Sequence, residues 1–323
     1  MKSQDSSWNL ESAPRISRRN LLKAGGLAAL GLSLALEETL TAGEPAASKP
    51  PAAKPAKTAS ILFFTKSSGF EHPVIKKPGD APSHAGGVLA KLGKENGFEI
   101  HEIKDGRVFD SKAFDDFDAF FFYTSADLTI AGDDKQPPMS EKGKKRLIEA
   151  IAGGKGFLGF HSATDSFHSA GEREKKQDKV DPYIAMIGGE FITHGRQQKA
   201  TMRVTSPKFP GCEKLGDSFA LLDEWYTLKN FAKDIHVILV NETKGMEDWM
   251  YNRPPFPATW ARHHGKGRVY YTSMAHREDV WTNPLFQQIV LSGTAWVLGR
   301  AEADVAPNID KETPRADELP KEK

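Results

Sequence analysis

The sequence predicts an α/β fold with a mostly parallel sheet, helices on both faces and a more strand-rich C-terminal half. Several short runs in the first half are apolar, and two of them are continuously so, which is typical of strands buried on both faces of a parallel sheet. Stretches with apolar residues at helical spacing alternate with these runs, which predicts right-handed crossovers. The predicted strands are 60–65, 98–103, 119–123 and 156–161, and the predicted helices are 85–95 and 140–152.

The second half contains further strands and one closing helix. An alternating segment at 199–205 and an apolar segment at 235–240 predict two strands. Segments 258–262 and 268–272 are close enough in the sequence to pair as a hairpin. Asn283-Pro284 is a helix-start signal, because asparagine caps the free backbone N–H groups and proline fits the first helical position.

The N-terminus predicts an export signal. Arg18-Arg19 stands before the apolar run 24–36, which is shorter than the roughly 20 residues that span a bilayer. A basic segment followed by a short apolar one is the layout of a removable signal, and the arginine pair indicates the twin-arginine route. Residues 1–42 are therefore expected to engage the twin-arginine export machinery, with a periplasmic or otherwise extracytoplasmic destination and no stable membrane anchor.

The rest of the chain divides into a linker, one domain and a tail. Residues 43–57 are rich in Ala, Pro and Lys, which predicts a solvated linker. Residues 58–300 suffice for one large α/β domain, and 301–323 are charged and are expected to fray. The formal net charge of +1 gives no electrostatic reason to expect nucleic acid as a partner. The single cysteine, Cys212, excludes a disulfide within the chain.

Four of the ten histidines follow predicted strands or lie in loops that contain glycine. They are His72, His161, His194 and His276. Ligands in open α/β sheets bind beyond the carboxyl ends of the strands, so these side chains are candidates for one shared site.

Five segments resemble, in order, those of the ThuA-like (trehalose utilization) family. They are ILFFTKSSGFEH, GKGFLGFHSATDSF, YIAMIGGEFITH, DEWYTL and PATWARHHGKGRVYYTSMAHREDVWTNPLF, which together span most of residues 60–300. The resemblance implies a flavodoxin-like fold similar to class I glutamine amidotransferases, and a carbohydrate as the substrate.

The sequence departs from the amidotransferases at their nucleophile. Those enzymes carry G-x-C-x-G at a sharp turn from strand to helix, whereas this chain has His161 in Gly159-Phe160-His161-Ser162-Ala163. Cys212 lies in a loop without that pattern, so a cysteine-dependent amidotransferase is excluded. An imidazole on such a turn can act as a general acid or base, or as a metal ligand.

The candidate site is therefore centred on histidine. If the four histidines meet, two or three of them would suit a divalent ion such as zinc; otherwise each makes an ordinary loop hydrogen bond. Asp223 and Glu224 are neighbours and would face opposite sides of an extended strand, so at most one points into a pocket. Glu224 is favoured as a carboxylate that orients a histidine or binds a hydroxyl, and it is the predicted catalytic residue beside His161. Possible substrate contacts are Lys66, Trp225, Tyr226 and Arg268. No nucleotide cofactor is expected.

Three classes of function remain open at this point. The first is an exported enzyme that hydrolyses or isomerises a glycoside or a keto-sugar at the histidines. The second is a carbohydrate-binding or accessory domain that has the fold without the catalysis. The third is a partner-binding protein, which would expose a large apolar patch. The first requires histidines within hydrogen-bonding reach of one another, whereas a binding domain requires only a cleft with aromatic side chains and hydrogen-bond donors.

Overall fold

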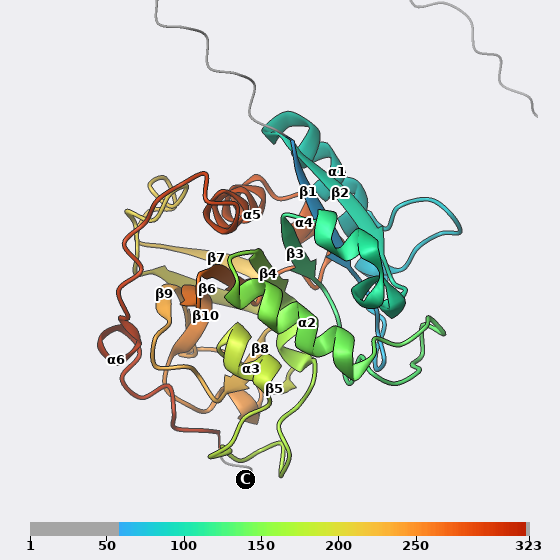
Figure 1. The fold of residues 1–323 in the computed structure, drawn as a ribbon. Helices are drawn as coiled ribbons and strands as arrows, with labels where there is room; N and C mark the ends of the chain where they lie inside the picture. The colour runs from blue at the N-terminus through green and yellow to red at the C-terminus, as the bar shows by residue number, and fades with distance from the viewer. Residues whose placement is uncertain (1–57, 321–323) are drawn as a thin grey trace, which may run out of the picture. The chain divides into compact units, whose positions relative to one another are not determined.

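A computed structural model describes residues 58–320 (Figure 1). The predicted signal, 1–42, and the linker, 43–57, lie outside the described residues. Within residues 58–320, no helix has the length and the apolar character needed to cross a membrane.

A nine-stranded sheet forms the centre of the domain, in the order β2-β1-β3-β4-β11-β10-β9-β6-β7. From β2 to β11 in this order, neighbouring strands are parallel, and from β11 to β7 they are antiparallel. The parallel part comprises β1 (Ala59–Phe64), β2 (Phe98–Ile103), β3 (Ala119–Phe122), β4 (Gly156–Phe160) and β11 (Gly267–Thr272). The antiparallel part adds β6 (Gln198–Val204), β7 (Ser218–Asp223), β9 (His236–Glu242) and β10 (Phe256–His264).

The predicted α/β class is confirmed, and the strand-rich second half extends the sheet. The strands β1, β3 and β4 are buried along almost their whole length, as their continuous apolar runs predict. The predicted hairpin forms β10 and β11, in which Arg262 pairs with Val269. A separate antiparallel pair, β5 (Glu190–His194) with β8 (Tyr226–Lys229), comes from segments for which no strand was predicted.

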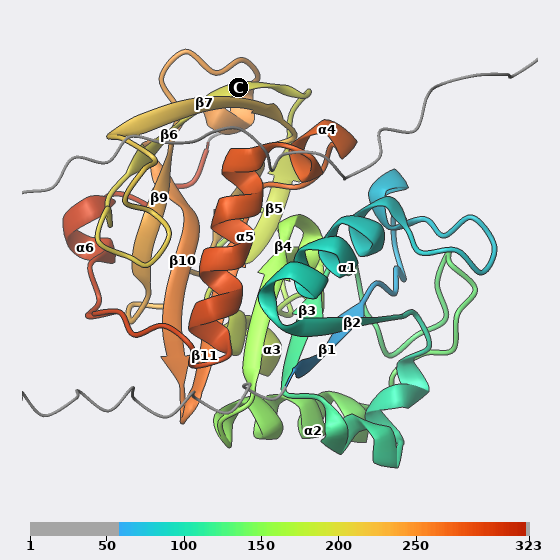
Figure 2. The same cartoon turned by 90° about the horizontal axis from the view of Figure 1, so that it is seen from above.

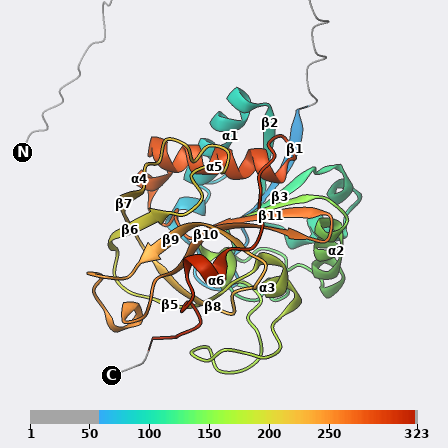
Figure 3. The same ribbon diagram turned by 90° about the vertical axis from the view of Figure 1, so that its left-hand side faces the viewer.

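Helices cover both faces of the sheet (Figures 2 and 3). On one face, α1 (His84–Asn96) and α5 (Pro284–Val297) bury apolar residues in one core, close to the short α4 (Glu278–Trp281). On the other face, α2 (Glu141–Ala152), α3 (Pro182–Ile187) and α6 (Ile309–Glu312) contribute to a second core. Short 3₁₀ turns occur at η1 (Pro73–Ile75), η2 (Gly106–Asp110), η3 (Lys112–Asp116), η4 (His161–Asp165) and η5 (Trp249–Tyr251).

The residues after Arg300 were expected to fray, and this expectation is wrong for 301–320. Ile309 and Ala316 are buried, 3% exposed each, against the second core. The Asn308 side chain bonds both the backbone N–H and the carbonyl of Val237 in β9, and buried Arg253 donates to the Ala316 carbonyl. The backbone of β9 and the Arg253 side chain therefore satisfy polar groups that a charged composition suggested would face water.

Candidate metal centre

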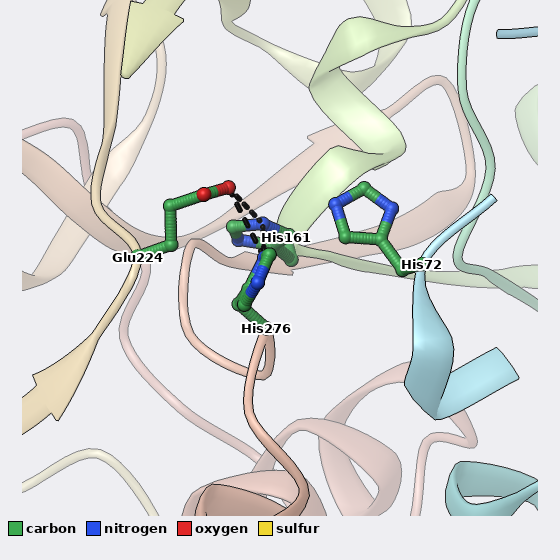
Figure 4. Close-up of side chains that lie close together, drawn as sticks. All are labelled: His72, His161, Glu224 and His276. Carbon is green, nitrogen blue, oxygen red and sulfur yellow. Dashed lines mark hydrogen bonds and ion pairs between the residues drawn. The ribbon is translucent and has the colours of Figure 1, made fainter. Parts of the chain in front are cut away.

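Four side chains meet at the carboxyl ends of the parallel strands (Figure 4). His72 follows β1, His161 follows β4, His276 follows β11, and Glu224 lies between β7 and β8. Each of the four offers one ligand atom, and these atoms all lie within 4.8 Å of one another. The topology explains the meeting, because parallel strands end at the same edge of a sheet.

His161 occupies a sharp turn directly after β4. Its φ angle is +39°, a left-handed conformation that is rare for residues other than glycine. The turn is crowded at Gly159, because a Cβ atom there would lie 3.1 Å from the Ala163 side chain and 3.0 Å from Ile187. A glycine at position 159 thus relieves a steric conflict next to the turn.

A backbone carbonyl fixes the orientation of the His161 ring. Its Nδ1 lies 2.9 Å from the carbonyl oxygen of Ser273, and only an N–H can bond that oxygen. A neutral His161 therefore carries its hydrogen on Nδ1 and directs the lone pair of Nε2 toward Glu224 and His276. A metal-binding histidine commonly has this second hydrogen bond, which fixes both the tautomer and the ring.

Three of the ligand atoms form a nearly equilateral triangle. Glu224 Oε1 lies 3.4 Å from His161 Nε2 and 3.1 Å from His276 Nδ1, and these two nitrogens are 3.3 Å apart. Zinc–ligand bonds of 2.0–2.1 Å in a tetrahedron place neighbouring ligand atoms about 3.3–3.4 Å apart. The triangle therefore has the size of one face of a zinc tetrahedron, the set of three protein ligands that is typical of catalytic sites.

His72 lies beside this triangle and fits a neutral ligand. Burial lowers the pKa of His72 well below its ordinary value, and the neighbouring His161 and His276 lower it further. Its Nδ1 is buried and has no hydrogen-bond partner among the described residues, while Nε2 lies 3.4 Å from the Tyr226 hydroxyl. A neutral imidazole with an unpaired nitrogen is the form that binds a metal ion.

Asp223 has a different role from its neighbour Glu224. Its buried carboxylate accepts hydrogen bonds from the backbone N–H groups of Glu224, Ala275 and Arg277. These bonds hold the loop that carries His276, in which Ala275 has a φ of +105°. The hydroxyl of Tyr123 also donates to the Ala275 carbonyl, a contact that sequence reasoning missed because Tyr123 ends an apolar strand and reads as core.

His194 lies outside the group of four, although the sequence placed it among the metal ligands. Its Nδ1 is 3.2 Å from Glu224 Oε2, the oxygen that points away from the triangle. The side chain is 43% exposed and stacks on the Tyr226 ring, with centroids 5.6 Å apart. His194 therefore lies at the solvent side of Glu224.

Four residues were predicted to contact a substrate, and each of them makes contacts within the domain. Trp225 is fully buried and donates to the Gln198 carbonyl, so it presents no face to a sugar. Tyr226 is 3% exposed, and its ring packs against His161 with centroids 4.1 Å apart, which makes it a wall of the centre. The other two are Lys66 and Arg268.

Lys66 and Arg268 both have partners inside the domain. Lys66 is fully buried and pairs with Asp134 at 3.1 Å. Arg268 is near the start of β11, whereas His276 follows the other end of that strand. Its guanidinium lies over the Trp296 ring and donates to the Ala301 carbonyl. Both cations thus have partners within the described domain, and their contact with a substrate stays a prediction.

Cys212 is a core residue and not a nucleophile. It is 1% exposed, and burial raises the pKa of its thiol to about 12. The thiolate, the reactive form, is therefore scarce at neutral pH.

A surface pocket of about 450 Å³ adjoins the centre. His276 and Pro73, which follows His72, are among its lining residues, together with Gln197 and Arg277. Arg277 donates to the Gln197 side chain at 2.7 Å. The volume is within the range of small-molecule sites, and His276 belongs both to this pocket and to the centre.

Comparison with known proteins establishes the family. The family model for ThuA, described as trehalose utilisation, matches residues 60–297. The chain belongs to the ThuA family. Its fold is similar to that of a ThuA-like protein from Bacteroides uniformis, with 17% identity, a TM-score of 0.56, and coverage of 77% of this chain and 95% of the other.

A second ThuA-like protein, from Parabacteroides merdae, has 15% identity and a TM-score of 0.53, over 83% of this chain and 98% of that one. At these identities the likeness concerns the fold alone. No curated protein matches the chain.

Proposed function

We propose that this ThuA domain is an exported enzyme that binds a divalent ion such as zinc and acts on a glycoside or a keto-sugar, as a hydrolase or an isomerase. The observation that carries the proposal is the triangle formed by His161, Glu224 and His276, with His72 beside it. Membership of a family described by trehalose utilisation supports the choice of a carbohydrate as the substrate.

The residues of the centre suit this chemistry. A bound divalent ion would act as a Lewis acid on an oxygen of the substrate. Burial raises the pKa of Glu224, but the neighbouring His161 and His276 outweigh it and hold that pKa well below its ordinary value. Glu224 is therefore ionised at neutral pH, as a ligand must be. In this proposal His194, which is 43% exposed beside Glu224, would hydrogen-bond a sugar hydroxyl.

Metal analysis tests the centre directly. The distances in the triangle also suit hydrogen bonds, so the metal content of protein purified without chelator separates the two interpretations. We expect nearly stoichiometric zinc or another divalent ion in the wild type, and little in His161→Ala and Glu224→Gln. The matched control is His101→Ala, because His101 is a partly exposed histidine on β2. Equal metal in the wild type and His161→Ala would refute the assignment.

Turnover tests the reaction. Disaccharides and their keto forms are incubated with the wild type and with His161→Ala, and the products are identified. An enzyme loses turnover in the variant while its circular dichroism spectrum is retained. A wild type that binds the sugars without converting any of them supports the carbohydrate-binding alternative instead.

A further inference from the structure

Phe70 is an exposed aromatic side chain next to the centre. It is 63% exposed, the largest exposed fraction among the large apolar side chains of residues 58–320. Its ring contacts the ring of His72 edge to face, with centroids 5.0 Å apart and planes at 85°. Single exposed apolar residues are common on proteins, so exposure matters here because of this contact.

The backbone around Phe70 is held firmly. The Ser125 hydroxyl donates to the Phe70 carbonyl at 2.9 Å, and the Ser68 N–H donates to the Ser125 carbonyl at 3.0 Å. A Cβ atom on Gly69 would lie 3.1 Å from Ala126, which shows how closely the loop after β1 packs on the loop after β3. Because the backbone is held and the ring already contacts His72, less conformational freedom is lost when a ligand binds here.

A buried ion pair ties the same two loops together. Asp134 accepts from the Ser67 N–H at 2.7 Å and from Lys66, and both charged side chains are almost fully buried. A buried ion pair contributes little net stability, since desolvation offsets the attraction. Its position is consistent with a role in fixing the loop that presents Phe70.

We propose that Phe70 is a stacking platform for a pyranose ring of the substrate. One face of a pyranose carries C–H groups with small positive charge, which pack on the negative face of an aromatic ring. Because Phe70 contacts His72, a sugar ring stacked on Phe70 would lie next to the four side chains of the candidate metal centre. This assignment rests on the proposed function and specifies a binding subsite for the substrate.

Saturation-transfer NMR with trehalose, maltose and cellobiose tests the subsite. Phe70→Ala is expected to raise the Kd of the bound disaccharide about tenfold. Phe70→Trp should retain binding, while Phe70→Leu, which is apolar but not aromatic, should not. The matched control is Ile130→Ala, since Ile130 is also exposed, 53%, on the neighbouring loop. The Kd of the Ile130→Ala variant should equal that of the wild type.

Metal content, measured on the same samples, separates this inference from the proposed function. Weaker binding in Phe70→Ala with unchanged metal supports the subsite, and it does so even if the wild type holds no metal. Equal affinity in the wild type, Phe70→Ala and Phe70→Leu overturns the subsite. Failure of the metal-loaded wild type to bind any of the three disaccharides also overturns it, while leaving the metal centre in place.

Discussion

At the scale of single residues, His161 shows what a local pattern can and cannot predict. The likeness of Gly159-Phe160-His161-Ser162-Ala163 to the amidotransferase turn indicates a sharp turn at His161, and the structure shows that a side chain at Gly159 would be crowded there. The partner of Nδ1, the Ser273 carbonyl, is 112 positions away and leaves no local trace. Nor does the sequence distinguish His194, which lies outside the group of four, from the histidines inside it. The fold alone decides which of them converge.

Asp223 is expected to support metal binding without touching the metal. Replacing it with Ala removes three acceptor contacts to backbone N–H groups, so the loop carrying His276 loses its anchor. Loss of such a supporting group typically weakens metal affinity about 10–100-fold. Competition with a chromophoric chelator measures this change. Asp118→Ala is the control, because Asp118 also accepts a backbone N–H, from Ser60 at the start of β1. Unchanged affinity in Asp223→Ala would contradict the role.

At the scale of elements, the charged segment 172–179 is held by a buried side chain, which its own sequence does not reveal. The run reads as a solvated loop, but Lys229, 1% exposed, donates to the Lys175 carbonyl and to the Gln177 side chain. Nearby, Glu190 of β5 accepts hydrogen bonds from Ser169 and Asn230. The pair β5 and β8 was missed because strands of five and four residues are too short to show a clear apolar period.

Glu190 and His168 make the anchoring of this segment pH-dependent. Burial raises the pKa of Glu190, but hydrogen bonds from His168, Ser169 and Asn230 outweigh it and lower the pKa to about 2. This stabilisation is present above the unfolded pKa of 4.5 and is lost as pH falls toward 2. Burial lowers the pKa of His168, but Asp165 and Glu190 raise it above 6.5. The stabilisation that His168 contributes is therefore lost as pH rises through its pKa in the folded state.

Urea unfolding of the wild type and Glu190→Gln at several pH values measures the effect. The free-energy difference between the two proteins should be largest between about pH 4.5 and 6.5, on the order of 2–3 kcal/mol, and should shrink on both sides of this window. The exposed Glu149→Gln on α2 is the control and should show no such window. A difference that stays constant from pH 3 to pH 8 would mean that these charges do not stabilise the segment.

At the scale of the whole molecule, local signals predicted the parallel part of the sheet and its helices well. The bounds of β1 and β3 follow from continuous apolar runs and those of β2 from an alternating one, and β1 pairs with both of the others. The placement of β11 beside β4, and of residues 301–320 against β9, depends on partners far away in the chain. Ile309 is buried because it packs against the second core. The charged sequence around it does not by itself reveal this contact.

Export of the whole protein depends, in our proposal, on the arginine pair in the segment 1–42, which lies outside the described residues. The twin-arginine route carries folded proteins, which suits a domain whose only cysteine, Cys212, is buried and which can acquire a metal ion before export. Replacing Arg18 and Arg19 together with Lys should leave the full-length precursor in the cytoplasm. Fractionation with immunoblotting detects it. Arg15→Lys, which changes a neighbouring basic residue outside the pair, should be exported like the wild type. Equal export of the double-lysine variant would show that another route carries the protein.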